Sequence, residues 1–190
     1  MPLNIFEPRY LEMIDSALAS DRLIGMIQPK LDGSTRSDGE PELCEVGCIG
    51  RIISFAETGD GRYIVSLHGV CRFRMVEEIA GRSPFRRSRI AVFAGDLDLD
   101  REAAEVDRAA LLKVFKAYLK ANDLEADWAS ISRAENATLV NALSMMAPYG
   151  ASEKQALLEA LDLKTRAETL IAITEIALAR GVEGAGTGLQ

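Results

Sequence analysis

The sequence lacks the features of several special classes of protein. Its 3 cysteines in 190 residues are too few, and odd in number, for a disulfide framework. Its 22 basic residues are outnumbered by 29 acidic ones, giving a net charge of −7, which argues against extensive contact with nucleic-acid phosphates. No apolar run approaches the roughly 18 residues of a membrane-spanning helix, and the first residues have no secretory signal pattern. We therefore expect a cytoplasmic protein without membrane association.

Motifs that hold nucleotides or build catalytic sites are also missing. The sequence contains no P-loop, no Gly-x-Ser-x-Gly elbow and no recognisable Ser-Lys dyad. Four residues of zinc-binding type occur in the first half: Cys44, Cys48, His68 and Cys71. The first two would lie about 13 Å apart along a strand, which favours packing roles over metal binding. We predict no metal, no cofactor and no catalytic residue; an enzyme whose site no motif reveals is the alternative.

The two halves of the chain differ in pattern and in charge. Residues 1–95 carry 12 basic and 13 acidic residues, with many β-branched residues and turn glycines, whereas residues 96–190 carry 10 and 16, with long patterns of helical period. We predict an α+β fold in which a barrel-like sheet of about five or six strands (1–95) precedes a four-helix bundle (96–182) and a flexible tail (183–190).

Strand and turn signals define the expected sheet. A helix over 7–19 precedes strands expected at 22–27, 43–55, 62–67, 70–76 and 85–93. Gly47 and Gly50 predict a bend or a close backbone approach, and residues 58–61 a tight hairpin. The polar stretch 30–41 predicts a mobile loop. Alternation places Arg72 and Arg74 on a solvated face.

Helix-start signals divide the second half. Acidic residues from Asp96 to Asp100 suit the positive end of a first helix, which runs to about Ala121. Ser132, Ser152 and Thr165 have capping-box spacing ahead of three further apolar stripes. These signals predict four helices in the second half.

Two groups of residues are candidates for contacts with a partner. The basic cluster Arg82–Arg89 suits phosphate or an acidic partner, including the protein's own acidic half, or else protects a solvated strand edge. Four aromatic residues, Phe6, Tyr10, Phe55 and Tyr63, suit a peptide groove, although aromatic side chains at such positions more often belong to the core.

An ordered set of motifs runs through nearly the whole chain and resembles a known family. In the first half these are Pro2–Tyr10, Glu45–Ile52, Asp60–Tyr63 and Leu67–Arg74; in the second half they are Ser152–Glu159 with Arg166 and Leu170. The set resembles the amino-terminal substrate-binding domain of the Lon protease family, in its small free-standing bacterial form. The resemblance implies a PUA-like β-barrel followed by a helical bundle, as in the related domain of cereblon.

The resemblance also implies a function. In full-length Lon this region precedes an ATPase module and a Ser-Lys protease domain and helps to engage unfolded substrates, so an ATP-dependent peptidase activity is not expected of this chain alone. Family members carry an additional first strand ahead of the Leu3–Tyr10 motif. Here Met1 stands almost at that motif, so we expect that strand to be missing, or the start to lie upstream, and a sheet edge to be open.

We therefore predict a non-enzymatic module that binds unfolded or extended polypeptide segments, with a protease or chaperone as a further partner. It would use the open edge and a cleft between barrel and bundle. The predicted binding residues are Phe6, Arg9 and Tyr10, and as a second choice Phe85 and Arg86. The alternative is a PUA-like RNA-binding domain that uses the cluster Arg82–Arg89. The sequence does not predict the oligomeric state.

Overall fold

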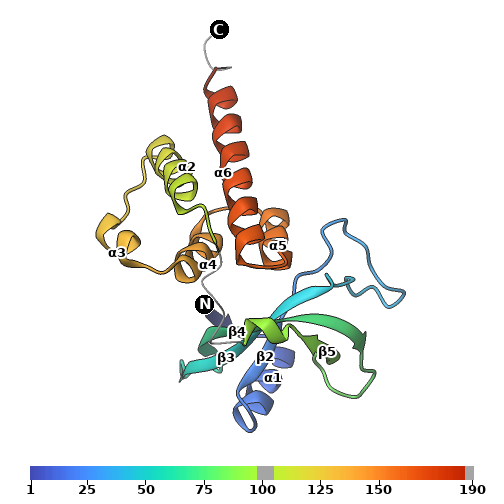
Figure 1. Ribbon diagram of the computed structural model, residues 1–190. Coiled ribbons are helices and arrows are strands. Elements are labelled where there is room, and N and C mark those ends of the chain that lie inside the picture. The colour runs from blue at the N-terminus through green and yellow to red at the C-terminus, as the bar shows by residue number, and fades with distance from the viewer. Residues whose placement is uncertain (98–104, 187–190) are drawn as a thin grey trace. The chain divides into compact units, whose positions relative to one another are not determined.

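The computed structural model describes residues 1–97 and 105–186, with side chains as far as residue 180. The chain divides into two units, Met1–Asp100 and Arg101–Gln190. The first, the sheet unit, contains five strands and one α-helix, and the second, the helical unit, contains helices alone (Figure 1). The α+β class predicted from the sequence is confirmed.

The sheet unit consists of β1 (Pro2–Ile5), α1 (Pro8–Leu18), β2 (Leu23–Met26), β3 (Val46–Glu57), β4 (Tyr63–Glu78), β5 (Ser88–Val92) and the 3₁₀ turn η1 (Ala94–Asp96). All pairs are antiparallel, in the order β1-β4-β3-β2, and β5 also pairs with β4. The β1 strand pairs with the beginning of β4 and β5 with its end. The 16-residue β4 replaces the two strands expected at 62–67 and 70–76, and β1 was not expected as a strand.

Irregular pairing curls the sheet. The register between β3 and β4 shifts between Ile49 and Gly50 and again between Ile52 and Ser54; such bulges bend a strand and increase its twist. A side-chain carbon on Gly47 would lie 2.4 Å from Cζ of Phe73 and 2.6 Å from the carbonyl oxygen of Met26. The bend and close approach predicted near these glycines are therefore confirmed.

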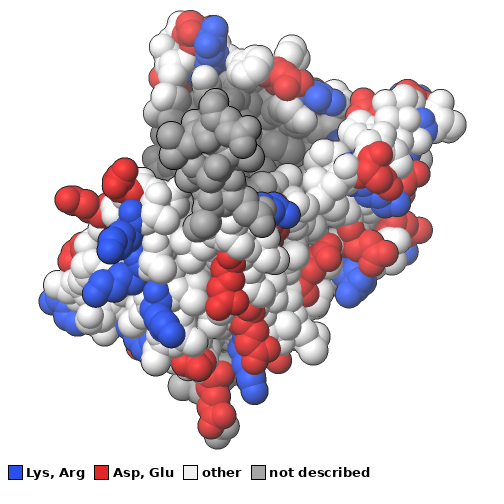
Figure 2. Space-filling model, turned by 90° about the horizontal axis from the view of Figure 1, so that it is seen from above, with Lys and Arg blue, Asp and Glu red and all other residues white. Residues whose placement is uncertain are grey.

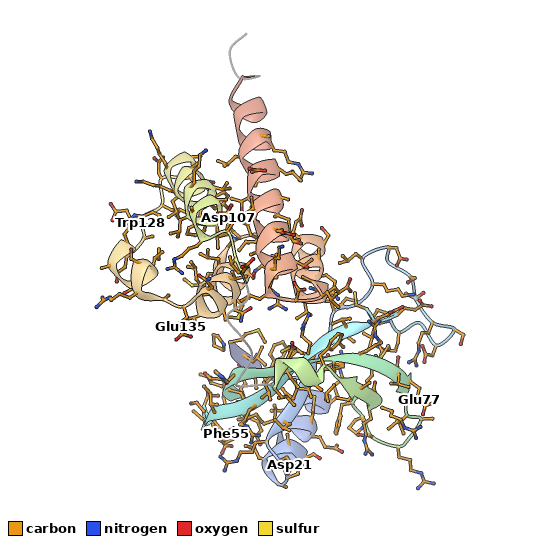
Figure 3. The ribbon with its side chains drawn as sticks, in the orientation of Figure 1. Asp21, Phe55, Glu77, Asp107, Trp128 and Glu135 are labelled. Atoms are coloured by element: carbon orange, nitrogen blue, oxygen red, sulfur yellow. The ribbon has the colours of Figure 1, made fainter. Side chains whose placement is uncertain are left out.

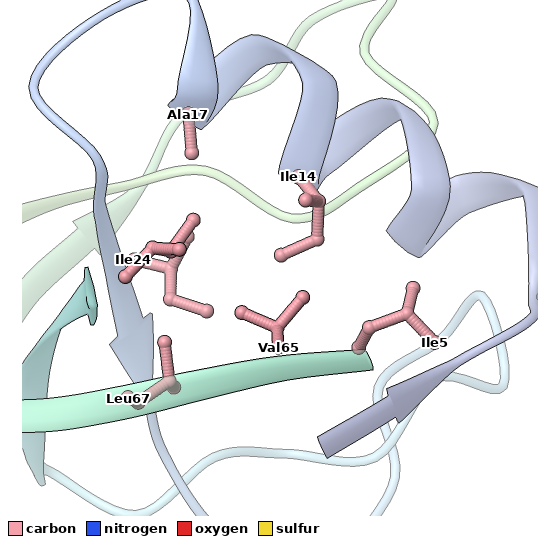
Figure 4. Close-up of a cluster of buried hydrophobic side chains, with 7 residues drawn as sticks. Ile5, Ile14, Ala17, Ile24, Val65 and Leu67 are labelled. Carbon is pink, nitrogen blue, oxygen red and sulfur yellow. The ribbon is translucent and has the colours of Figure 1, made fainter. Parts of the chain in front are cut away.

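A small apolar core lies between α1 and the sheet (Figure 4). Ile14 of α1 and Val65 of β4 are fully buried at its centre. The cluster as a whole contains Ile5, Ile14, Ala17, Ile24, Ile52, Val65 and Leu67. The helix predicted over 7–19 is confirmed, with Pro8 at its start, where the missing N–H costs no hydrogen bond. Its buried stripe places α1 over the sheet.

Residues 29–43, called the arm here, form an irregular hairpin. Pro29 pairs with Leu43 and Thr35 with Pro41. The backbone N–H of Lys30 donates to the carbonyl oxygen of Glu42 at 2.7 Å, and that of Arg36 to Glu40 at 2.8 Å. The segment is a loop outside the named strands, as expected, and its mobility stays a prediction; cross-strand hydrogen bonds need no apolar periodicity to form.

The predicted solvent-facing position of Arg72 was wrong. Arg72 is 5% exposed, and its Nε donates to Oδ2 of Asp96 at 2.8 Å while Nη2 donates to Oδ1 at 2.9 Å. Its guanidinium lies 4.8 Å from the ring centre of Phe93. Asp96 therefore anchors η1 to β4 instead of starting a helix.

The helical unit has five helices where four were predicted: α2 (Arg108–Ala121), α3 (Trp128–Arg133), α4 (Asn136–Met146), α5 (Ala151–Glu159) and α6 (Leu163–Gly186). The first starts at Arg108 instead of near Asp96, and the predicted start at 98–100 lies outside the described residues. The last includes residues 183–186 of the predicted tail; residues 187–190 also lie outside the described part.

The three predicted capping boxes were wrong. Ser132 lies inside α3 and donates to the carbonyl oxygen of Trp128 at 2.7 Å, and Ser152 and Thr165 lie inside α5 and α6. The carboxylate of Asp162 instead accepts the N–H of Thr165 at 2.8 Å. Hydroxyl side chains can also bond to carbonyls within a helix, so the spacing alone did not locate the helix starts.

The core of the helical unit follows the apolar stripes seen in the sequence. It contains Leu111, Leu139, Val140, Leu143, Leu157, Ala167 and Leu170. One polar contact supports it, between the hydroxyls of Tyr149 and Thr174, whose oxygens are 2.6 Å apart. Burial is the first cause of a raised pKa at Tyr149.

Candidate functional site

The three first-choice binding residues lie where β1 leads into α1. Phe6 directly follows β1 and is 61% exposed. Arg9 donates from Nε to Oε2 of Glu7 at 2.9 Å, and its guanidinium lies 4.7 Å from the ring centre of Tyr10. Tyr10 packs against the sheet-unit core. Phe6 is thus available for an apolar contact, whereas Tyr10 mainly has a packing role.

The outer edge of β1 has a limited capacity for pairing. Met1 and Leu67 exchange two backbone hydrogen bonds, of 2.7 and 2.8 Å. Since bonding alternates along an antiparallel strand, the backbone groups of Pro2 and Asn4 face away from β4. No strand of the described residues pairs with this edge. Pro2 supplies no N–H, so Asn4 carries the strand's outward donor.

Apolar side chains remain exposed at the same end of the sheet. Phe55, at the end of β3 (Figure 3), is 42% exposed, and Ile53 and Ile64 are 63% and 48% exposed. The Phe55 ring packs edge-on against Tyr63, with 4.9 Å between the ring centres. Tyr63 pairs with Ile5, the residue before Phe6. We call this set the hairpin-end surface: Phe6, Ile53, Phe55, Tyr63 and Ile64. It spans both faces of the sheet, because Phe55 pairs with Val65 and shares its face, whereas Ile64 lies on the opposite face.

A shallow pocket adjoins the hairpin-end surface. It has a volume of about 390 Å³ and is lined by Leu18, Arg22, Ile52, Ile53, Ser54 and Phe55. Its shape follows from the register shift between Ile52 and Ser54, which displaces Ile53 from the regular pairing. Sequence analysis missed Ile53 and Ile64 because an apolar residue within a strand pattern predicts burial, and no sequence signal located the shift.

The second-choice residues Phe85 and Arg86 lie elsewhere. Arg86 donates from Nε to Oε2 of Glu78 at 3.0 Å and from Nη1 to the carbonyl oxygen of Pro41 at 2.7 Å. Arg36 of the arm also contacts Glu78, with 2.6 Å between Nη1 and Oε2. The hydrogen bond from Arg86, followed by that from Arg36, lowers the pKa of Glu78. Arg86 therefore fastens the arm to the sheet.

The structure does not bring the two predicted groups together. Phe6 lies beside Tyr63, the first residue of β4, whereas Arg86 bonds to Glu78, its last residue. Figure 3 shows the same separation, with Phe55 at one end of the sheet and Glu77 at the other.

The basic cluster is partly neutralised. Arg86 pairs with Glu78, and Arg89 pairs with Glu77 at 2.8 Å. Arg82 and Arg87 are exposed, and neither has an ion pair within the part of the chain that the structure describes. In the view of Figure 2, acidic and basic side chains are intermingled over much of the surface.

The surroundings of the three cysteines indicate structural roles. Burial raises the pKa of the thiols of Cys48 and Cys71, which makes them poor nucleophiles near neutral pH. Cys44 contacts the carbonyl oxygen of Pro29 at the base of the arm. Among residues 1–97 and 105–186, no three His, Cys, Asp or Glu side chains are placed to hold a metal ion. In the same residues, no helix is long and apolar enough to cross a membrane.

Comparison with protein families gives one match over most of the chain. Residues 1–175 match the model of the ATP-dependent protease La (LON) substrate-binding domain. The chain is 25% identical over 172 residues to a Lon protease of Syntrophus aciditrophicus, covering 87% of this chain and 21% of that protein. It is 29% identical over 183 residues to Lon protease 2 of Sorangium cellulosum, covering 91% and 22%. The chain thus spans about a fifth of the length of these relatives.

Two solved structures share the fold. A Lon N-terminal domain protein from Xanthomonas campestris has a TM-score of 0.63 at 20% identity, over 90% of this chain and 88% of that one. The N-terminal domain of a Mycobacterium avium complex Lon protease has a TM-score of 0.61 at 19% identity, over 92% and 90%. The likeness extends over both the strands and the helices of this chain.

Proposed function

Because the chain belongs to the Lon substrate-binding domain family, we propose that it is a non-catalytic module that binds exposed apolar or extended segments of other polypeptides. Binding by the module requires none of the catalytic groups of the longer Lon proteases. A protease or chaperone that receives the bound polypeptide is the corresponding partner. Proteolysis and ATP use are activities of the longer relatives and form no part of this proposal.

The observation that carries the proposal is the hairpin-end surface. Single exposed apolar residues are common on proteins, but several of them around one end of a sheet favour a contact region. Phe6, Ile53, Phe55 and Ile64 are each at least 42% exposed, and a pocket adjoins Ile53 and Phe55. Unfolded polypeptides expose apolar side chains that folded ones bury, so such a surface favours the unfolded form.

The RNA-binding alternative has weaker support. Two of the four arginines of Arg82–Arg89 are occupied by glutamates, and the net charge of the chain is −7. Phosphate binding depends on several uncompensated cations acting together. Polypeptide binding is therefore the function that we propose.

A binding comparison tests the proposal. We expect the full chain to bind a reduced, carboxymethylated protein that cannot refold, and not the same protein in its native state. The double substitution Phe6→Ser and Phe55→Ser should raise Kd by about tenfold or more, as loss of exposed aromatic contacts does at other interfaces. The change in fluorescence anisotropy of the labelled unfolded protein gives Kd.

The matched control removes exposed apolar side chains elsewhere. Met146 and Leu161 of the helical unit are 81% and 76% exposed, and Met146→Ser with Leu161→Ser should leave Kd unchanged. Equal binding of native and unfolded protein contradicts the proposal. A loss of binding in the control variant alone assigns the contact to the helical unit and removes the hairpin-end surface from it.

A further inference from the structure

The outer edge of β5 carries unpaired backbone groups along its whole length. The N–H of Phe93 donates to the carbonyl oxygen of Arg72 at 3.0 Å, and that of Ile79 to Arg87 at 2.8 Å. Residues 87 and 93 therefore face β4, and alternation turns the N–H and C=O groups of Ser88, Ile90 and Val92 away from it. Among the described residues, no strand pairs with this edge.

The side chains along this edge also alternate in character. Ile90 pairs with Met75 and Val92 with Phe73, so these apolar side chains share one face of the sheet. They are 37% and 49% exposed. Arg89 lies on the opposite face, and so does Arg87 by the same period of two. One face beside the edge is therefore apolar, and the other carries Arg87 together with the ion pair of Arg89 and Glu77.

The two open edges of the sheet differ in their ability to accept a strand. Natural edge strands are protected by proline, bulges, short length or charge. The β1 edge has Pro2 and one outward donor, whereas residues 85–93 contain no proline or glycine and present three outward donors. The β5 edge is a strand of five residues whose main protection is charge, and this protection does not act against a strand of the opposite charge.

The charged side chains beside the β5 edge also indicate which kind of polypeptide segment can pair with it. In an antiparallel pair of two copies of β5, the arginines of both copies would lie close together, and like charges across a strand pair are destabilising. An acidic strand would instead meet Arg87, which has no ion pair within the described part of the chain. The favoured occupant is thus an acidic segment of another polypeptide, not a second copy of this chain.

We propose that the β5 edge binds, by strand addition, an extended polypeptide segment in which apolar and acidic residues alternate. The apolar residues of the segment lie beside Ile90 and Val92, and its acidic residues lie on the face that carries Arg87. Backbone hydrogen bonds supply affinity, and the alternating side chains supply specificity. The inference rests on the proposed polypeptide-binding function, to which it adds a second surface with a sequence preference.

Peptides of fixed composition test the preference. We compare a short labelled peptide of alternating valine and glutamate with a peptide that has the same residues in two blocks, and with one of alternating valine and lysine. Fluorescence anisotropy with the full chain should give a Kd about tenfold lower for the alternating acidic peptide than for either of the others. Its affinity should fall as salt is added, because the arginines are exposed.

Two proline substitutions distinguish peptide binding at the β5 edge from peptide binding at the β1 edge. The N–H of Ile90 faces outward, so Ile90→Pro removes a donor for the peptide and no hydrogen bond to β4. It should raise Kd about tenfold, because one lost strand-pairing contact and the proline ring both oppose addition. Asn4→Pro makes the same change on the β1 edge and should leave Kd unchanged. Arg87→Glu should weaken binding of the acidic peptide and strengthen that of the lysine peptide.

A measurement on the unaltered chain covers the case in which Ile90→Pro does not fold. The alternating acidic peptide should slow hydrogen exchange at the amides of Ser88, Ile90 and Val92, and not at that of Asn4. Lack of slowing at these β5 amides overturns the inference.

Other outcomes separate the two proposals. Equal affinity for the alternating and block peptides, or loss of binding in Asn4→Pro alone, overturns the β5 inference while polypeptide binding stands. Failure to bind both the peptides and the unfolded protein removes the proposed function as well. Displacement of the peptide by a single-stranded RNA oligonucleotide, with loss of RNA binding in Arg87→Glu, overturns the inference in favour of nucleic acid.

Discussion

The sheet unit and the helical unit use their arginines differently. In the sheet unit, arginines pair with carboxylates and join distant segments, as Arg72 does with Asp96 and Arg86 with Glu78. In the helical unit, Arg108 donates to the side-chain oxygen of Asn136 at 2.9 Å, and Arg166 to that of Asn141 at 2.8 Å. These latter contacts join a charged group to a neutral amide.

The difference follows from how each unit acquires its core. Amphipathic helices place an apolar stripe toward their neighbours and keep their charges on the opposite face. The sheet unit includes segments without such a period, the arm and η1, which bring little apolar surface to the core. Ion pairs hold these segments to the sheet. The excess of acidic residues in the second half of the sequence therefore does not mean that ion pairs stabilise the helical unit.

The largest expected effect comes from breaking the best-buried ion pair. Asp96→Ala leaves the guanidinium of Arg72, which is 5% exposed, without its bidentate partner. Removing one member of a buried pair costs about 3–5 kcal/mol of unfolding free energy. Hydrogen exchange of the β3 and β4 amides should therefore become faster, as measured by mass spectrometry.

The single tryptophan makes this test selective. Trp128 lies in α3 of the helical unit, so its fluorescence during urea unfolding reports on that unit. Asp96→Ala should leave the midpoint of this transition unchanged. A shift of the tryptophan transition by the same free energy would show that the two units unfold together and would break the comparison.

A slightly smaller loss of stability is expected from a substitution in the core of the helical unit. Leu170 is 1% exposed in the helical core, and Leu170→Ala should reduce the unfolding free energy by about 2–5 kcal/mol through lost burial and a cavity. The tryptophan transition should move to lower urea, and added salt should leave the size of the change unaltered. Faster hydrogen exchange in β3 and β4 in this variant would show that the sheet unit is destabilised as well. That result would contradict independent stability of the two units.

The smallest effect is expected at the arm, where it depends on pH. The pKa of Glu78 is lowered in the folded protein by the hydrogen bond from Arg86, then by that from Arg36. A carboxylate whose folded pKa is lowered contributes stability above its unfolded pKa, and this contribution is lost as the pH falls through the folded value. Protection of the arm amides, measured as the exchange rate relative to the intrinsic rate at each pH, should therefore fall on acidification while protection in α2 and α6 stays the same.

A variant of the same residue checks the cause. Glu78→Gln should accelerate exchange in the arm near neutral pH, at a cost of about 1 kcal/mol, and should remove most of its dependence on acid. Glu77→Gln changes the neighbouring residue, whose partner Arg89 is outside the arm, and serves as the control. An arm with the same acid response in Glu78→Gln would show that another group controls it.

The sequence predicted most of the elements. The α1 helix, β2, β3, the hairpin at residues 58–61 and the four apolar stripes of the helical unit agree with the structure, because period and turn chemistry are local properties. The α3 helix was missed: it has six residues and is too short to show a period. Helix starts were misplaced where several residues nearby could act as caps.

The candidate site was predicted less completely. Phe6 and Phe55 were identified as aromatic residues that a partner could contact, and both are exposed. Arg86 was chosen because it lies in a basic run, but its partner Glu78 and the carbonyl of Pro41 are distant in sequence. Ile53 and Ile64 gave no sign of exposure, since a strand pattern indicates only which residues share a face.

By itself, the sequence determined the α+β class, the order of the main elements and the family, because periodicity, turn residues and ordered motifs are written along the chain. Only the tertiary structure decided which charges pair and which apolar residues stay exposed. The reason is physical: burial and ion pairing depend on strand register and on contacts between segments far apart in the chain. The pocket beside Phe55 is an example: it lies at the register shift between Ile52 and Ser54, and Leu18 and Arg22, far from this shift in the sequence, also line it.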